Sequence, residues 1–163
     1  MKVIIRDIGF GERWRMASYL FRVKAEWDPR NLWRDIVIGG GRSLVDLHKA
    51  INTSFEIGFD HLWFFGTNED YWRSKMMYKS PMDFEFLPKW MEFWDQLSGR
   101  NEVEVNAAGV TIDDLNLKVR DSLCYLFDYA DEWRFYLILK KRFEDESSQK
   151  EPVVVKGKGE IFG

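Results

Sequence analysis

The alternation of apolar and polar positions near the start of the chain predicts a pair of strands. In SYLFRVKAEW (18–27) apolar side chains alternate with mainly polar neighbours, which is typical of a strand with one buried face. The segment DPRN (28–31) contains residue types that favour a turn, and LWRDIVIGG (32–40) is predicted as the returning strand. Residues 18–40 are therefore expected to form a β-hairpin. The inward positions of its first strand are Tyr19, Phe21, Val23 and Ala25.

A helix is predicted after this hairpin. Ser43 is a suitable N-cap, and Asp46 follows three residues later, where a carboxylate interacts favourably with the helix start. The apolar residues that follow, together with one histidine, recur at helical spacing. Gly58 is a natural point for the helix to end. These positions are Leu44, Leu47, His48, Ile51 and Phe55.

The rest of the chain is predicted as strands interrupted by a helical region. HLWFFGT (61–67) is expected to be a strand, and DYWRSKMMY (70–78) is a further strand candidate. LPKWMEFWDQLSG (87–99) has helical spacing, with a proline in its first turn. EVEVNAAG (102–109) is predicted as a short strand, and TIDDLNL (111–117) as a capped turn of helix.

The last third predicts a closing hairpin and a tail. SLCYLFDYA (122–130) and EWRFYLILKKRFE (132–144) are its two strands. The tail, residues 144–163, begins as a charged linker and is expected to add an edge strand at 153–155.

The predicted architecture is a single domain over residues 1–163. Its class is expected to be α+β, with a mostly antiparallel sheet and a β-grasp-like β-β-α-β opening. One helix should pack on one face, residues 66–105 should form a helical insertion, and the hairpin should close the fold.

Composition narrows the class of protein. Aromatic residues reach 17% of the 163 residues, a proportion that suits a stiff core or a binding surface. The net charge of −3 argues against nucleic-acid binding by bulk electrostatics, although residues 1–42 hold nine Lys and Arg against five Asp and Glu. The single cysteine, Cys124, excludes an internal disulfide and is expected to be a buried, inert thiol. The start MKVIIRDIGF lacks a signal-peptide pattern and no apolar run has membrane-spanning length, so a cytoplasmic protein is expected.

Several short motifs resemble one known family in the right order. They are Trp33-Arg34 on the second strand, Leu47-His48 on the helix, His61 with Phe64 or Phe65 on the next strand, and FDYADEW (127–133) with Asp128, Asp131 and Trp133. This set resembles the plasmid pRiA4b ORF-3-like family. Ala130 stands where that family usually has glycine, the cysteines of the family's tail are absent, and residues 66–105 match little. The resemblance implies an α+β fold and a set of candidate residues, but no established activity.

Two histidines and two carboxylates among these motifs suggest a metal site. His48, His61, Asp128 and Asp131 could supply imidazole and carboxylate ligands to a divalent transition metal. The alternative is structural: a hydrogen-bonded core histidine, and acids that form local bonds in a turn. Asp128 lies among apolar strand positions and needs a partner, for which Arg34, His48 and His61 are the candidates.

Trp33 and Arg34 point to opposite faces of their strand. An ion pair from Arg34 to Asp128 or Asp131 would fix the hairpin, and an anion-binding Arg34 is the functional alternative. The predicted function is a binding or interaction module with an unidentified protein or small-molecule partner. The first alternative is a metal-dependent, hydrolytic enzyme that uses the His and Asp residues. The second is a nucleic-acid accessory protein, because some family members lie beside mobile elements.

Overall fold

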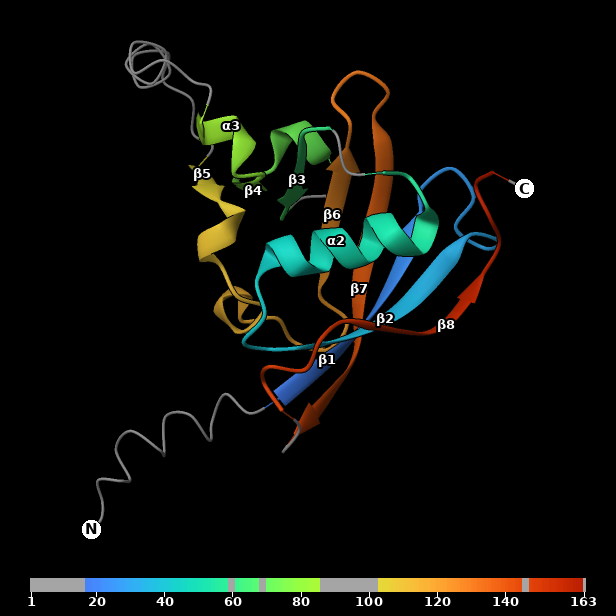
Figure 1. The fold of residues 1–163 in the computed structure, drawn as a ribbon, viewed down its shortest axis with the longest axis vertical. Helices are drawn as coiled ribbons and strands as arrows, with labels where there is room; N and C mark the ends of the chain where they lie inside the picture. Colours follow the sequence, from blue (N-terminus) through green and yellow to red (C-terminus); the bar gives the residue numbers. More distant parts are fainter. Residues whose placement is uncertain (1–16, 59–60, 68–69, 86–102, 145–146, 163) are drawn as a thin grey trace.

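One sheet of eight strands organises the molecule (Figure 1). The computed structural model describes residues 17–58, 61–67, 70–85, 103–144 and 147–162. The strands follow the spatial order β5-β4-β3-β6-β7-β1-β2-β8. They are β1 (Ala17–Ala25), β2 (Trp33–Gly39), β3 (Trp63–Gly66), β4 (Met76–Lys79), β5 (Val103–Asn106), β6 (Ser122–Phe127), β7 (Trp133–Glu144) and β8 (Val153–Lys158).

The two predicted hairpins are confirmed. β1 pairs with β2 in antiparallel register, with Phe21 opposite Ile36, and the alternate side chains of β1 are buried as expected. β6 pairs with β7 in the same way, with Tyr125 opposite Phe135. β1 also pairs with β7, so the first described strand lies in the interior of the sheet and joins the two hairpins.

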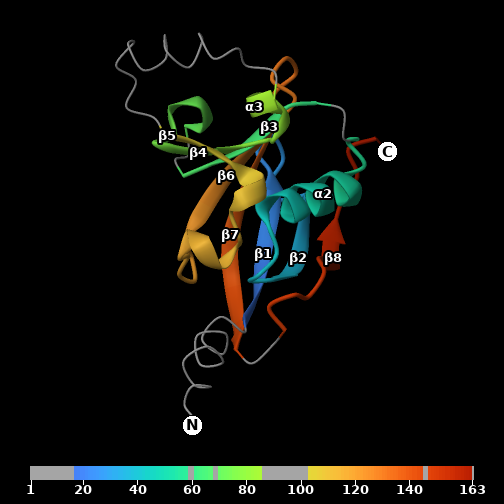
Figure 2. The same ribbon diagram turned by 60° about the vertical axis from the view of Figure 1, so that its left-hand side comes forward.

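The helix predicted after the first hairpin is α2 (Leu44–Phe55). The Ser43 hydroxyl accepts a hydrogen bond from the Asp46 amide at 3.2 Å, as an N-cap should. The helix ends before Gly58, because Glu56 takes a left-handed conformation with φ 57° and its amide bonds to carbonyls of the last turn. Figures 1 and 2 show α2 crossing the strands at a steep angle.

Side chains on the two sides of the sheet form separate buried clusters. The larger cluster contains the inward residues of α2 and the strand side chains that meet them, including Phe65, Tyr125 and Phe127. A smaller cluster is formed by side chains that point the other way. Its members are Phe64, Tyr71, Met77, Cys124 and Leu126. Successive side chains of β3 and β6 therefore point to opposite sides of the sheet and pack into different clusters.

The remaining described elements are short. A 3₁₀ turn, η2 (Tyr71–Arg73), and the four-residue helix α3 (Met82–Glu85) flank β4. Two further 3₁₀ turns, η3 (Ala107–Gly109) and η4 (Asp113–Leu115), lie between β5 and β6. The predicted helical turn within residues 111–117 corresponds to η4. The predicted helix at 87–99 lies outside the described residues.

The predicted fold class is wrong. The structure is dominated by one large mixed sheet, and its described residues contain two α-helices, of twelve and four residues. It is not an α+β domain with a mostly antiparallel sheet and a helix packed on one face. Residues 66–105, predicted as a helical insertion, contribute β4 and β5, which pair in parallel and make the sheet mixed. The β-grasp-like opening does not form a small sheet of its own, because β6 and β7 separate β3 from β1.

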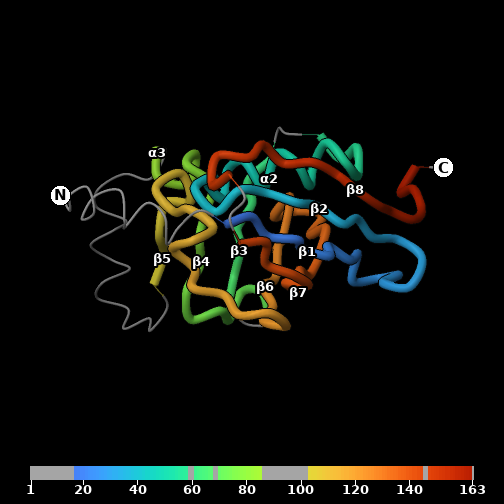
Figure 3. The backbone as a smooth tube through the Cα atoms, turned by 90° about the horizontal axis from the view of Figure 1, so that it is seen from below, coloured from blue at the N-terminus to red at the C-terminus, as the bar shows by residue number. Residues whose placement is uncertain are grey.

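The tail adds a strand at the opposite edge from β5. β8 pairs with β2 and is longer than the predicted 153–155. Figure 3 shows β8 and α2 running along the same side of the molecule. None of the described helices has the length and apolar character needed to cross a membrane.

Candidate functional site

His48 is held in a buried polar network beneath α2. Its Nδ1 lies 2.6 Å from the Tyr125 hydroxyl, which also accepts a hydrogen bond from the Asn52 amide at 2.7 Å. The tautomer of the imidazole decides whether Nδ1 donates to this hydroxyl or accepts from it. The imidazole stacks on Trp63, with ring centroids 4.0 Å apart.

The environment of His48 keeps its ring neutral. Burial lowers the pKa of His48 to about 3, and the nearby positive charge of Lys49 acts in the same direction. A neutral imidazole can position neighbouring groups and accept or donate hydrogen bonds. It does not supply a positive charge at physiological pH.

Asp128 directly follows β6, and its two carboxylate oxygens have different partners. Oδ1 accepts hydrogen bonds from the amides of Ala130 at 3.0 Å and Asp131 at 3.3 Å, which close the hairpin turn. Oδ2 lies 3.5 Å from Nδ1 of His61. The backbone of Asp128 has φ 68°, a left-handed conformation that Asp tolerates better than most residues. Asp128 is therefore both a turn residue and the partner of His61.

His61 precedes β3 and is half exposed, with 51% of its side chain accessible. One edge of its ring meets Phe127 at a centroid distance of 5.6 Å. The ring of His61 is open to solvent on one side and contacts the buried carboxylate of Asp128 through Nδ1.

The two histidines line one cavity of about 470 Å³. Its walls come from α2, from His61 and the start of β3, and from the segment that leads into α3. Trp63 and Met82 supply apolar surface. Ser80 also lines it. The Ser80 hydroxyl is buried and has no hydrogen-bond partner within the described part of the chain.

The described residues that line this cavity include one cationic side chain, Lys49, and no carboxylate. The imidazole of His61 is also on the lining. Among the described residues, no base is hydrogen-bonded to the Ser80 hydroxyl. The arrangement is suited to hold a small, largely apolar molecule that carries an acidic group.

Arg34 has a structural environment away from this cavity. Its guanidinium donates to the carbonyl oxygens of Trp33, Ser54, Lys158 and Gly159 at 2.8–3.0 Å. It also covers the Phe55 ring at 4.6 Å. Burial lowers the pKa of Arg34 from its ordinary value. The predicted ion pair with Asp128 or Asp131 is wrong, because the guanidinium N–H groups donate instead to these main-chain carbonyls of α2, β2 and the end of β8.

The other motif residues also lie apart from the cavity. Trp33 stacks under the Arg22 guanidinium at 4.0 Å. Trp133 begins β7 and meets Trp27 edge-on, with centroids 5.5 Å apart. Asp131 is exposed in the hairpin turn.

The four predicted metal ligands are only partly brought together. His61 lies beside Asp128, and His48 shares the cavity with His61. Across the ranges that the structure describes, no group of three or more His, Cys, Asp or Glu side chains could hold a metal ion. The metal site therefore stays a prediction.

Three residues of the site were not singled out from the sequence. Tyr125 alternates inward on its strand, and Asn52 follows His48 by one helical turn, so spacing could have placed both near the histidine. Ser80 gives no comparable signal, because its position depends on how β4 ends against β3. Its amide bonds to the carbonyl of Trp63 at 2.9 Å.

A family model and a solved structure are similar to this chain. The family model described as plasmid pRiA4b ORF-3-like protein matches residues 17–162. A crystal structure of a protein of unknown function, MM3350 from Methanosarcina mazei Go1, is similar with a TM-score of 0.60 and 18% sequence identity. The similarity covers 87% of this chain and 69% of that one, and at this identity it concerns the fold alone. No curated protein matches the chain. The match over nearly all described residues places the chain in the plasmid pRiA4b ORF-3-like protein family.

Proposed function

We propose that the protein is a single-domain, non-catalytic binding module, and that its ligand is a small, largely apolar molecule with an acidic group. The observation that carries the proposal is the position of Ser80. Its buried hydroxyl, without a partner among the described residues, lines the same cavity as His48 and His61. A buried hydroxyl left unpaired is costly, and a ligand that hydrogen-bonds to it would recover that free energy.

Charge supports the choice of an acidic ligand. Among the described residues on the wall, Lys49 is the cation, and the imidazole of His61 can hydrogen-bond to an acidic group. Trp63 and Met82 would contact the apolar body of the ligand, which is the usual division of roles in small-molecule sites. We place the protein in the cytoplasm, in keeping with its single, free and buried cysteine.

A panel of aromatic and aliphatic monocarboxylates, each with its neutral amide, tests the proposal by thermal shift and calorimetry. We expect carboxylates to bind and their amides to bind more weakly. Ser80→Ala should weaken binding about twofold to tenfold through the lost hydrogen bond, without destabilising the free protein. Lys49→Met should weaken carboxylates only, whereas Lys140→Met on β7 is the matched control. If no member of the panel binds, the proposal fails.

A metal-dependent hydrolase is the second candidate, and one observation favours it. His61 lies 3.5 Å from Asp128 and faces a cavity that His48 also lines. The test is elemental analysis of untagged protein purified without chelator, for the wild type and His61→Ala. A near-stoichiometric metal that is absent from the folded variant would favour the hydrolase over the binding module.

The nucleic-acid accessory role stays a prediction. Four of the nine basic residues in the segment 1–42 precede the first described residue, so their arrangement gives no support either way. Binding to DNA or RNA that falls steeply with added salt would support this role, and no binding at low salt would remove it.

A further inference from the structure

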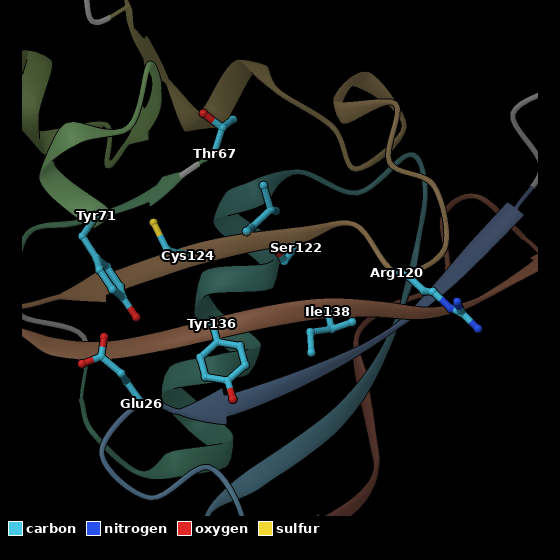
Figure 4. Close-up of a pocket in the computed structure, with 9 residues that line it drawn as sticks. Glu26, Thr67, Tyr71, Arg120, Ser122, Cys124, Tyr136 and Ile138 are labelled. Atoms are coloured by element: carbon cyan, nitrogen blue, oxygen red, sulfur yellow. The ribbon is translucent and has the colours of Figure 1, made fainter. Parts of the chain in front are cut away.

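A second cavity lies on the other side of the sheet from α2. It has a volume of about 500 Å³, and Figure 4 shows its residues in front of β6 and β7 with α2 behind them. Its floor consists of two cross-strand pairs, Cys124 opposite Tyr136 and Ser122 opposite Ile138. Because these residues alternate with the side chains of the main core, this cavity shares no lining residue with the one beside His61.

The two ends of this cavity carry opposite charges. Glu26 and Arg120 are both exposed, and Figure 4 shows them at opposite ends with Tyr136 and Ile138 between them. The Glu26 amide bonds to the carbonyl of Arg134, and the Arg120 amide bonds to that of Leu139. These β7 positions are five residues apart, which corresponds to roughly 17 Å along a strand.

Neighbouring groups modify the charge at the Glu26 end of the cavity. Arg134 stacks over Tyr71 at 4.7 Å and is paired with Glu132 at 2.7 Å, and its positive charge also interacts with Glu26. The Nζ of Lys24 lies over the Tyr136 ring, 5.9 Å from its centroid, but Lys24 is not part of the lining. Among the described lining residues, Glu26 is the one carboxylate and Arg120 the one cation.

The surface between the charges suits a peptide. Tyr71 is buried, and its hydroxyl lies 3.1 Å from the Phe135 carbonyl and also interacts with the Glu26 side chain. Tyr136 and Ile138 are half exposed. Such rings offer contact area at little cost in conformational entropy. An extended chain spans about 3.3–3.6 Å per residue, so about five residues would bridge the two charges.

From this geometry we infer that the second cavity binds a short extended peptide of about five residues with free ends. Its terminal ammonium group lies at Glu26 and its terminal carboxylate at Arg120. The inference does not depend on the proposed function of the cavity beside His61.

The test combines blocked peptides with charge-removing variants. The probe is a five-residue peptide of alternating alanine and serine, with free ends, with an acetylated N-terminus, or with an amidated C-terminus. Calorimetry should give an affinity loss of about threefold to tenfold for each blocked end on the wild-type protein. Glu26→Gln should cause the same loss for the free peptide and no further loss for the acetylated one.

Arg120→Asn should behave in the same way toward the amidated peptide. Asn is chosen because Arg120 has φ 85°, a conformation that Asn tolerates. Glu160→Gln and Lys156→Gln, in the exposed tail beyond or within β8, are the matched controls and should leave the affinity unchanged. The inference is overturned if the free peptide does not bind, or if blocking its ends has the same effect on the variants as on the wild type.

Discussion

Asp128 combines two tasks that separate substitutions can distinguish. It keeps a left-handed backbone with φ 68°, and it caps two amides of the turn while facing His61. Asp128→Ala removes the caps and places a poor residue in this conformation, so we expect a loss of about 2–3 kcal/mol in the free energy of unfolding. Asp128→Asn keeps the caps and should cost less than about 1 kcal/mol. Urea unfolding measures both, and equal losses would mean that the contact with His61 dominates.

His48 should make stability depend on pH. Its pKa is about 3 in the folded protein, below the value of about 6.5 for an unfolded chain. The unfolded state therefore binds the proton first as the pH falls. The stabilisation is fully present above pH 6.5 and is lost between there and pH 3, by up to about 1.4 kcal/mol per pH unit.

The measurement is urea unfolding of the wild type and His48→Gln at several pH values from 7 to 4. The difference in stability between them should shrink as the pH falls below 6. In NMR spectra, the ring signals of His48 should not titrate between pH 5 and 8. A titration in that range would contradict the neutral, buried state.

At the scale of elements, Arg34 joins β2, the end of α2 and β8 through main-chain carbonyls. Lysine cannot reproduce this fork, so Arg34→Lys should lower the free energy of unfolding by about 1–3 kcal/mol. Hydrogen exchange should become faster in β8 and unchanged in β6. Arg30→Lys, in the exposed turn between β1 and β2, is the control. Equal exchange rates in β8 for both variants would show that Arg34 does not hold the tail.

Elements with a strong local pattern could be predicted from the sequence. The alternation of Tyr19, Phe21 and Val23 and the Ser43 cap gave β1 and the start of α2. The strand candidate at 70–78 overlaps β4, but its bounds and its partner could not be predicted in the same way, because the pairing depends on the distant residues of β5, with Met77 opposite Glu104. Spacing also could not show that Arg34 would bind carbonyls, because a guanidinium donates to carboxylates and to main-chain carbonyls, and spacing does not show which acceptor lies within reach.

At the scale of the whole molecule, the two cavities lie on different sides of the sheet and share no lining residue. We expect their effects on binding to be independent, as for separated sites. His61→Asn should weaken carboxylates and leave peptide affinity unchanged, and Glu26→Gln should do the reverse. For each ligand, calorimetry on the double variant should give a change in binding free energy equal to the sum of the changes in the two single variants. A departure larger than about 0.5 kcal/mol would mean that the sheet couples the sites.

The strand order also decides when the protein can fold during its synthesis. β1 lies between β2 and β7, and Phe21 pairs with Leu139. The hairpin of β1 and β2 can form early, but its open edge stays unpaired until β7 has been made. Contacts between such distant segments are slow to form. Most of this chain would therefore be synthesised before its central sheet could close. Until then, the unpaired edge of β1 would be the region most exposed to aggregation with other chains.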